Sequence, residues 1–247
     1  MQSTVIVVPC YNEAGRINVS AFTSFLDSHD GISFLFVDDG STDGTDSILK
    51  DLLQHDKRLS FLQLDCNSGK GEAIRRGVML AMEGNPQYVG FWDSDLATPL
   101  NEIEDFIQTL DVDPTCEMVF GARVNLLGRN VKRGLFRHYA GRIFATFAAN
   151  VLKLPIYDTQ CGAKIFRVNN CCRLIFAEPF ISKWIFDVEI VARLIKARQG
   201  TDQRQAKDVI VEYPLRNWQE TDGSKLRLAD MFVVGSDLLR IYRKYTR

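Results

Sequence analysis

The sequence predicts an α/β fold whose central sheet is mostly parallel, and three observations point to it. Short apolar runs at residues 4–8, 32–37, 61–64 and 88–92 have the length and composition of buried strands. Segments with helical composition separate these runs, and polar or glycine-rich turns follow them. Strand and helix patterns that alternate at such short intervals are typical of βαβ units around a parallel sheet.

The first strand is predicted at residues 4–8, where the chain is rich in β-branched side chains. Pro9 is expected to end it, because proline has no N–H to donate to a strand ladder. A loop at residues 9–13 follows, and Asn18 or Ser20 is suited to cap the next helix.

The second and third strands lead into turns that can begin helices. The second ends in D-D-G-S-T-D-G-T at residues 38–45, whose glycines permit tight turning and whose polar side chains can cap a helix at about 46–54. After the third strand, N-S-G-K-G at 67–71 opens a helix predicted over about 72–82. The chain therefore places small and polar residues just beyond each strand.

The fourth strand, at residues 88–92, ends in two carboxylates, Asp93 and Asp95. Ligands of open α/β sheets gather at the carboxyl ends of the strands. Carboxylate oxygens are suited to Mg²⁺ or Mn²⁺, which would in turn hold a diphosphate. Taken alone, the pair could equally be an acidic turn.

The composition is that of an ordinary globular protein. The chain has 247 residues, 46% hydrophobic and 25% charged, with a net charge of −1 that gives no pull toward nucleic acid. Six cysteines are scattered without a C-x-x-C pair, which favours a reduced, cytoplasmic chain. No stretch reaches the roughly 18 apolar residues of a membrane span.

Four motifs in order resemble the family 2 glycosyltransferases of GT-A fold. They are V-I-V-V-P-C-Y-N-E at 5–13, F-V-D-D-G-S-T-D-G-T at 36–45, N-S-G-K-G at 67–71 and D-S-D at 93–95. The resemblance implies a three-layer α/β/α fold and a single domain over 1–247. Its first half, 1–120, would bind the nucleotide sugar, and 121–247 would form the acceptor side.

The second half of the chain resembles the polyprenyl-phosphate branch, the dolichyl-phosphate mannose and glucose synthases. The motifs are G-A-R at 121–123, D-T-Q-C-G-A-K-I-F at 158–166, W-I-F-D-V-E at 184–189 and G-S-K-L at 223–226. The second and third of these favour the glucosyl members. The resemblance implies inverting, metal-dependent transfer of a hexose, glucose before mannose, from UDP-glucose or GDP-mannose to polyprenyl or dolichyl phosphate.

The resemblance also implies roles for individual residues. Nucleotide-sugar contacts would come from Pro9, Tyr11, Glu13, Asp39, Lys70, Asp93, Asp95 and, as a closing-loop contact to the diphosphate, Lys225. Asp93 and Asp95 would hold the Mg²⁺ or Mn²⁺ ion, with Asp95 also counted as catalytic. Related mannosyl enzymes often carry a further polar ligand where this chain has Ala97, which predicts weaker metal binding without nucleotide. Asp38 could equally be a turn or capping residue or a ligand.

A phosphate acceptor needs no general base, because its oxygens are already anionic near neutral pH. It needs cations, and a basic cluster follows the fifth motif: Arg123, Arg129, Lys132, Arg133 and Arg137. By family analogy, Arg123 with Arg133 or Arg137 would bind the acceptor phosphate, and Arg123 and Arg137 would be catalytic. The cluster could also be a solvated face.

Asp158, Gln160, Asp187 and Glu189 are the remaining polar candidates. Asp158 and Gln160 would shape the acceptor or sugar site. Asp187 is predicted to be catalytic, and it would be the base if the acceptor were a sugar hydroxyl. Asp187 and Glu189 could instead cap and solvate a helix. Transfer to a glycan or soluble hydroxyl, or a non-catalytic nucleotide-sugar-binding protein, are the alternative functions.

Two segments, 135–152 and 231–247, carry apolar faces with basic residues between them. Either could lie in a bilayer interface and present the basic cluster to lipid phosphate, or could be a core helix. The expected location is cytoplasmic, and peripheral attachment to the cytoplasmic face of a membrane is the most that the sequence supports.

Overall fold

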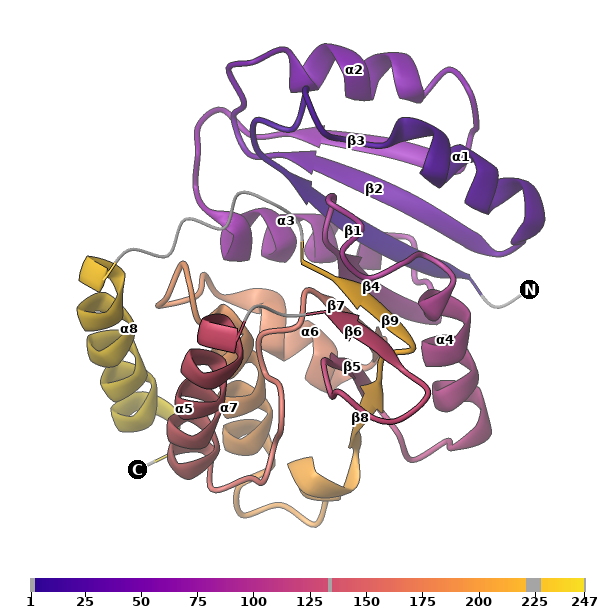
Figure 1. Cartoon of the computed structure of the whole chain (residues 1–247). Coiled ribbons are helices and arrows are strands. Elements are labelled where there is room, and N and C mark those ends of the chain that lie inside the picture. Colours follow the sequence, from indigo (N-terminus) through magenta and orange to yellow (C-terminus); the bar gives the residue numbers. More distant parts are fainter. Residues whose placement is uncertain (1–2, 133–134, 221–227, 247) are drawn as a thin grey trace.

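The structure is a computed structural model that describes residues 3–132, 135–220 and 228–246, with side chains omitted at 132, 135–138, 140 and 228–232. A seven-stranded sheet runs through the centre, in the order β3-β2-β1-β4-β7-β5-β8 (Figure 1). Its strands are β1 (Thr4–Cys10), β2 (Ile32–Asp38), β3 (Leu59–Gln63), β4 (Tyr88–Trp92), β5 (Met118–Ala122), β7 (Ala163–Arg167) and β8 (Ile210–Pro214). All neighbours are parallel except β7, which is antiparallel to both β4 and β5.

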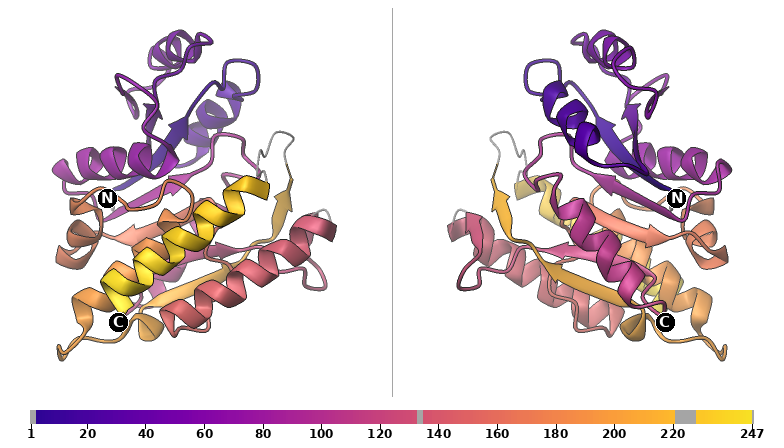
Figure 2. Two further views of the ribbon diagram at one scale, coloured as in Figure 1. Left: turned by 90° about the vertical axis from the view of Figure 1, so that its left-hand side faces the viewer. Right: turned by 90° about the vertical axis from the view of Figure 1, so that its right-hand side faces the viewer.

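Helices cover both faces of this sheet, as the three-layer prediction requires. Alternate side chains of β1 serve the two layers, since Val7 packs in one core cluster and Ile6 and Val8 in the other. One layer contains α1 (Val19–Ser28), α2 (Thr45–Leu52) and α4 (Glu102–Val112). The other contains α3 (Lys70–Glu83), α5 (Leu135–Leu152), α6 (Asn170–Ala177) and α7 (Phe186–Arg198), with α8 (Leu228–Ile241) and the π-helical turn η2 (Tyr242–Thr246) joining it at the C-terminal end. Figure 2 shows α8 along the outside of this second layer.

Three smaller elements complete the chain. A short ribbon pairs β6 (Asn130–Lys132) with β9 (Asn217–Gln219) in parallel. A 3₁₀ turn, η1 (Ala206–Asp208), precedes β8. No helix in the described part of the chain is long and apolar enough to cross a bilayer.

The structure confirms Asn18 as the cap of the first helix and extends the first strand beyond its predicted end. Asn18 caps α1, because its side-chain oxygen accepts from the N–H of Ala21 at 3.1 Å. β1 differs from the prediction in that it continues through Pro9 to Cys10. The pairing of β1 with β4 ends at Val7, so Pro9 lies beyond that ladder and its missing N–H does not interrupt it.

The sheet order places a crevice beside β1. The chain runs from β1 to β2 and β3 on one side, and then returns to lay β4 on the other side of β1. The carboxyl ends of β1 and β4 therefore lead into loops that part in opposite directions, which is the switch point where open α/β sheets bind ligands. The antiparallel β7 then brings the segment 158–164 against the end of β4.

Candidate active site

A pocket of about 300 Å³ lies at this switch point. Its walls come from the ends of β1, β2 and β4 and from the start of α3. Thirteen residues line it: Pro9, Cys10, Tyr11, Glu13, Arg16, Asp39, Asn67, Gly69, Lys70, Ala73, Asp93, Ser94 and Asp95. The structure thus brings together all the predicted nucleotide-sugar residues that it describes.

Asp39 forms one wall of the pocket and is held by backbone N–H groups. Its two carboxylate oxygens accept from the N–H of Ser68 at 2.7 Å and of Gly69 at 2.8 Å. Burial raises the pKa of Asp39, and the two hydrogen bonds oppose that rise. Asp38, by contrast, accepts from the backbone and hydroxyl of Ser41, which makes it the turn residue of the two alternatives.

Tyr11 and Glu13 lie on the loop after β1. Tyr11 lines the pocket and is 45% exposed. Glu13 is buried and binds Arg16 through both oxygens, at 2.5 and 2.6 Å. Arg16 lines the pocket but was not predicted from the sequence, although its position three residues after Glu13 in the same loop was the available signal.

Asp93 and Asp95 share the turn after β4, and Gly162 shapes it. A Cβ at Gly162 would lie only 1.9 Å from Asp93 Oδ2, so only glycine leaves room for this carboxylate. The backbone N–H of Asp93 also donates to the carbonyl of Gly162 at 3.1 Å. Asp95 accepts from the N–H of Ala97 at 3.0 Å.

These two carboxylates fit a divalent cation that also binds phosphate oxygens. The described residues contain no group of three or more His, Cys, Asp or Glu side chains able to hold a metal by themselves. Mg²⁺ and its substitutes are commonly held by one or two carboxylates together with substrate phosphates and water. Gly162 leaves room for the Asp93 carboxylate, so Asp93 and Asp95 can supply the one or two carboxylates of such a site.

Lys70, the first residue of α3, lies across the pocket from this turn. Its Nζ is 2.5 Å from Asp93 Oδ1, and the two side chains are 43% and 31% exposed. Burial of the ammonium opposes its charge, but Asp93, Asp187 and Asp95 outweigh it, so the pKa of Lys70 is raised. The raised pKa favours the charged form of this lysine in the pocket.

Asp187 lies beneath the pocket rather than in its wall. The fully buried Lys164 donates to Asp187 Oδ1 and to the carbonyl of Cys161, each at 2.5 Å. Burial raises the pKa of Asp187, and the ion pair with Lys164 opposes the rise. Next to it, Phe186 packs against Gly71, where a Cβ would be 2.9 Å from the ring.

Glu189, the last residue of the W-I-F-D-V-E motif, is fully buried and organises the segment before α7. It pairs with Arg193 at 2.8 Å and accepts from the N–H of Ile181 and the hydroxyl of Tyr245. Arg193 in turn donates to three carbonyls between residues 175 and 179. Glu189 thus anchors a loop and the C-terminal turn, and it does not reach the pocket.

Arg123 follows β5 and is locked to Asp158. Two nitrogens of its guanidinium donate to the two carboxylate oxygens at 2.6 and 2.8 Å, and its backbone N–H donates as well. The guanidinium carbon also lies 5.4 Å from the centre of the Trp218 ring. Asp158 accepts in addition from the N–H of Gln160. The motif 158–164 therefore positions Arg123, Asp93 and Asp187 together.

Three predicted residues cannot be placed. Arg133 and Lys225 lie outside the described residues, and Arg137 belongs to α5 but its side chain is not described. Of the rest of the basic cluster, Arg129 is half-buried in the turn before β6.

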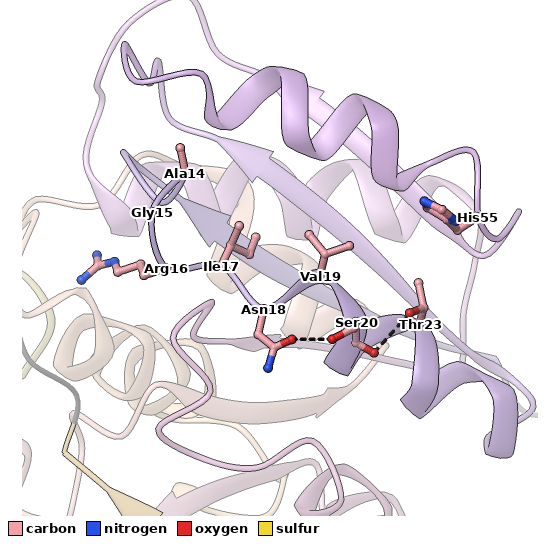
Figure 3. A pocket seen from close by; sticks show the side chains of 9 residues that line it. All are labelled: Ala14, Gly15, Arg16, Ile17, Asn18, Val19, Ser20, Thr23 and His55. Atoms are coloured by element: carbon pink, nitrogen blue, oxygen red, sulfur yellow. Dashed lines mark hydrogen bonds between the residues drawn. The ribbon is translucent and has the colours of Figure 1, made fainter.

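A wider hollow of about 630 Å³ adjoins the pocket at Arg16 (Figure 3). It is lined by residues 14–20, Thr23 and His55. Its polar side chains mainly serve α1, since Ser20 donates to Asn18, and Thr23 donates to the carbonyl of Ser20. We therefore assign the chemistry to the smaller, acidic pocket.

A parallel sheet with an acidic, lysine-bearing pocket at its switch point is the arrangement of nucleotide-binding α/β proteins. Residues 5–173 match the family model "Glycosyl transferase family 2". The chain belongs to this family, and it is a glycosyltransferase.

Curated relatives match over nearly the whole chain. The dolichyl-phosphate beta-glucosyltransferase of Saccharomyces cerevisiae is 30% identical over 263 residues, covering 97% of this chain and 74% of that protein. The protein of the same name from Dictyostelium discoideum is 29% identical with the same coverage.

Among solved structures, glucosyl-3-phosphoglycerate synthase from Mycobacterium tuberculosis is similar. Its complex with Mn²⁺, UDP-glucose and phosphoglyceric acid has a TM-score of 0.66 at 20% identity, over 98% of this chain and 80% of that one. This likeness confirms the GT-A fold predicted from the sequence.

Proposed function

We propose that this glycosyltransferase moves glucose from UDP-glucose to a polyprenyl phosphate such as dolichyl phosphate, with inversion at the anomeric carbon. The observation that carries the proposal is the single pocket in which Asp39, Lys70, Asp93 and Asp95 meet at the ends of three strands. The names of the curated relatives support glucose as the sugar and a lipid phosphate as the acceptor.

The donor would lie across the pocket with its base beside Tyr11 and Asp39. Both oxygens of Asp39 already accept a backbone N–H, and each carboxylate oxygen can accept a second, so the base could also donate there. We favour UDP-glucose over GDP-mannose. The complex of the mycobacterial enzyme with UDP-glucose and Mn²⁺ supports this choice.

The diphosphate would lie toward Lys70, Asp93 and Asp95. A divalent cation held by the two carboxylates would neutralise the charge that develops on the leaving diphosphate. Lys70 adds a positive charge on the same side, and the missing side chain of Gly162 leaves room for the Asp93 carboxylate. Either Mg²⁺ or Mn²⁺ suits this donor set.

The acceptor phosphate would attack without a general base. Its oxygens are already anionic, so the protein needs only to place them. We propose Arg123, with Arg133 or Arg137, for that task. Asp158 engages two of the three guanidinium nitrogens of Arg123, which leaves Nη1 to meet an anion. Asp187 is ion-paired below the pocket, which supports a reaction in which it does not act as a base.

A lipid acceptor requires contact with a membrane, and α5 has a suitable face. Tyr139, Ile143 and Phe147 follow one another at i, i+4 spacing, and each is at least 60% exposed. The opposite side of the helix is buried through Ala145, Ala148 and Leu152 among others. We propose that this stripe lies in the interface of the cytoplasmic leaflet.

Transfer to a soluble hydroxyl is the second candidate, favoured by the phosphoglyceric acid bound to the mycobacterial neighbour. The test offers labelled UDP-glucose and Mn²⁺ with dolichyl phosphate, dolichol or 3-phosphoglycerate. Label in the organic phase with dolichyl phosphate alone supports the proposal. Label in the aqueous product with 3-phosphoglycerate, and none in the lipid, would favour the second candidate.

A further inference from the structure

The ammonium of Lys70 forms an ion pair with Asp93 Oδ1, one of the oxygens that we assign to the metal. Nζ is 2.5 Å from Asp93 Oδ1, and both side chains are accessible from the pocket. A divalent cation on that oxygen would repel the ammonium, because like charges at contact distance disfavour each other. Metal binding and this ion pair therefore compete for Asp93.

A second carboxylate lies within electrostatic reach of Lys70. Phe186, next to Asp187, packs against Gly71, next to Lys70, and the charge of Asp187, like that of Asp93, raises the pKa of Lys70. Lys164 engages Asp187 Oδ1, and no hydrogen bond of Oδ2 occurs among the described residues. Asp187 can thus receive a second cation on its other oxygen.

Lys164 explains why this carboxylate is present beneath the pocket. It is fully buried between β4 and β5, with Nζ 5.2 Å from the ring centre of Phe91 and 5.1 Å from that of Phe120. The chain Asp93, Lys70, Asp187, Lys164 therefore alternates in charge from the pocket to the core. A buried charge is tolerated only where a partner neutralises it, so Lys164 and Asp187 require each other.

We propose that Lys70 exchanges partners: it holds Asp93 in the free protein, and it moves to the diphosphate and Asp187 when metal and nucleotide sugar bind together. Lys164 is the positioning residue that keeps Asp187 in place for this exchange. The inference rests on the proposed metal site. It makes cation binding weak without nucleotide, because Lys70 must first be displaced, and strong with it.

The test measures Mn²⁺ affinity by the paramagnetic resonance of free Mn²⁺, with and without UDP. Lys70→Met is expected to tighten Mn²⁺ binding without UDP by about tenfold, since it removes the competing cation, and to weaken UDP binding. Lys183→Met is the matched control, because Lys183 is exposed at the same pocket mouth, against Gly69, and has no ion pair among the described residues. Its Mn²⁺ affinity should change by less than about twofold.

The double variant Lys164→Met/Asp187→Asn removes both buried charges at once and so avoids a lone one. It should leave the affinity for Mn²⁺ alone nearly unchanged and lower the affinity for Mn²⁺ with UDP. If the protein binds Mn²⁺ with UDP but Lys70→Met does not tighten binding of Mn²⁺ alone, the exchange is overturned. If the wild-type protein binds no Mn²⁺ even with UDP, the metal assignment itself falls, and the exchange with it.

Discussion

At the turn after β4, Gly162 and Lys70 flank the carboxylate of Asp93. Gly162 leaves room for the carboxylate because it has no side chain, and Lys70 attracts the carboxylate by its positive charge. Asp95, two residues on, is tied to the backbone of Ala97 and completes the turn. Lys70, Asp93 and Gly162 are thus distant in sequence and adjacent in space at this turn.

Asp95→Asn keeps the shape of the side chain and removes its charge. We expect turnover with saturating Mn²⁺ to fall about a hundredfold or more, because a metal on the diphosphate supplies several kcal/mol of stabilisation to the transition state. Initial rates over a range of Mn²⁺ concentrations measure the effect. A variant that keeps wild-type rates and metal dependence would remove Asp95 from the site.

Gly162→Ala would place a Cβ 1.9 Å from Asp93 Oδ2, so the carboxylate must leave its seat. We expect the affinity for Mn²⁺ with UDP to drop about tenfold, comparable to the loss of a residue that orients a metal ligand. Gly235→Ala in α8 is the control, since its Cβ meets nothing within 4 Å. That change should stabilise the helix by about 0.5–1 kcal/mol. Equal affinities for the two variants would contradict the role of Gly162.

At the scale of elements, β7 connects the two halves of the site. It enters the sheet antiparallel between β4 and β5, so the segment before it crosses the end of β4. Gly162 then meets Asp93, Lys164 meets Asp187 at the start of α7, and Asp158 meets Arg123 at the end of β5. One reversed strand therefore links the ends of β4 and β5 to the start of α7.

The C-terminal turn η2 is held to α7 by a buried hydrogen bond from the Tyr245 hydroxyl to Glu189, at 3.0 Å. Tyr245→Phe should lower the free energy of unfolding by about 1–3 kcal/mol, because a charged group loses a buried partner. Urea denaturation measures the loss. Tyr242→Phe, in the same turn, should be near neutral; a similar loss there would mean that the hydrogen bond to Glu189 is not the cause.

The sequence predicts residues at the ends of strands more readily than residues that meet across the sheet, for a physical reason. Asp93 and Asp39 follow apolar strands directly, and such local patterns reveal where strands end. Gly162 and Lys164 depend on pairing between strands distant in sequence. Lys164 also makes β7 hard to predict, because a charged residue is not expected inside a buried strand. Its partner, Asp187, comes from another element, α7.

Helix α5, which carries the exposed stripe of Tyr139, Ile143 and Phe147, belongs to the same layer as α7 and the C-terminal turn. Figure 2 shows the position of this helix. Ile143→Glu should reduce cosedimentation with vesicles containing anionic lipid several-fold, since a charge in that face opposes burial in the interface. Val112→Glu is the control, because Val112 is 77% exposed at the end of α4 in the opposite layer. If both substitutions act alike, or neither acts, α5 is not the membrane face.

The reaction that we propose for this pocket is transfer of glucose to a lipid phosphate with inversion. The most direct measurement is the structure of the product made from UDP-glucose, polyprenyl phosphate and Mn²⁺, by mass spectrometry and by NMR of the anomeric proton. We predict a β-linked glucosyl phosphate that forms only with metal, and little product from GDP-mannose. An α-linked product would rule out inversion, and glucose found only in a water-soluble product would rule out the lipid phosphate as acceptor.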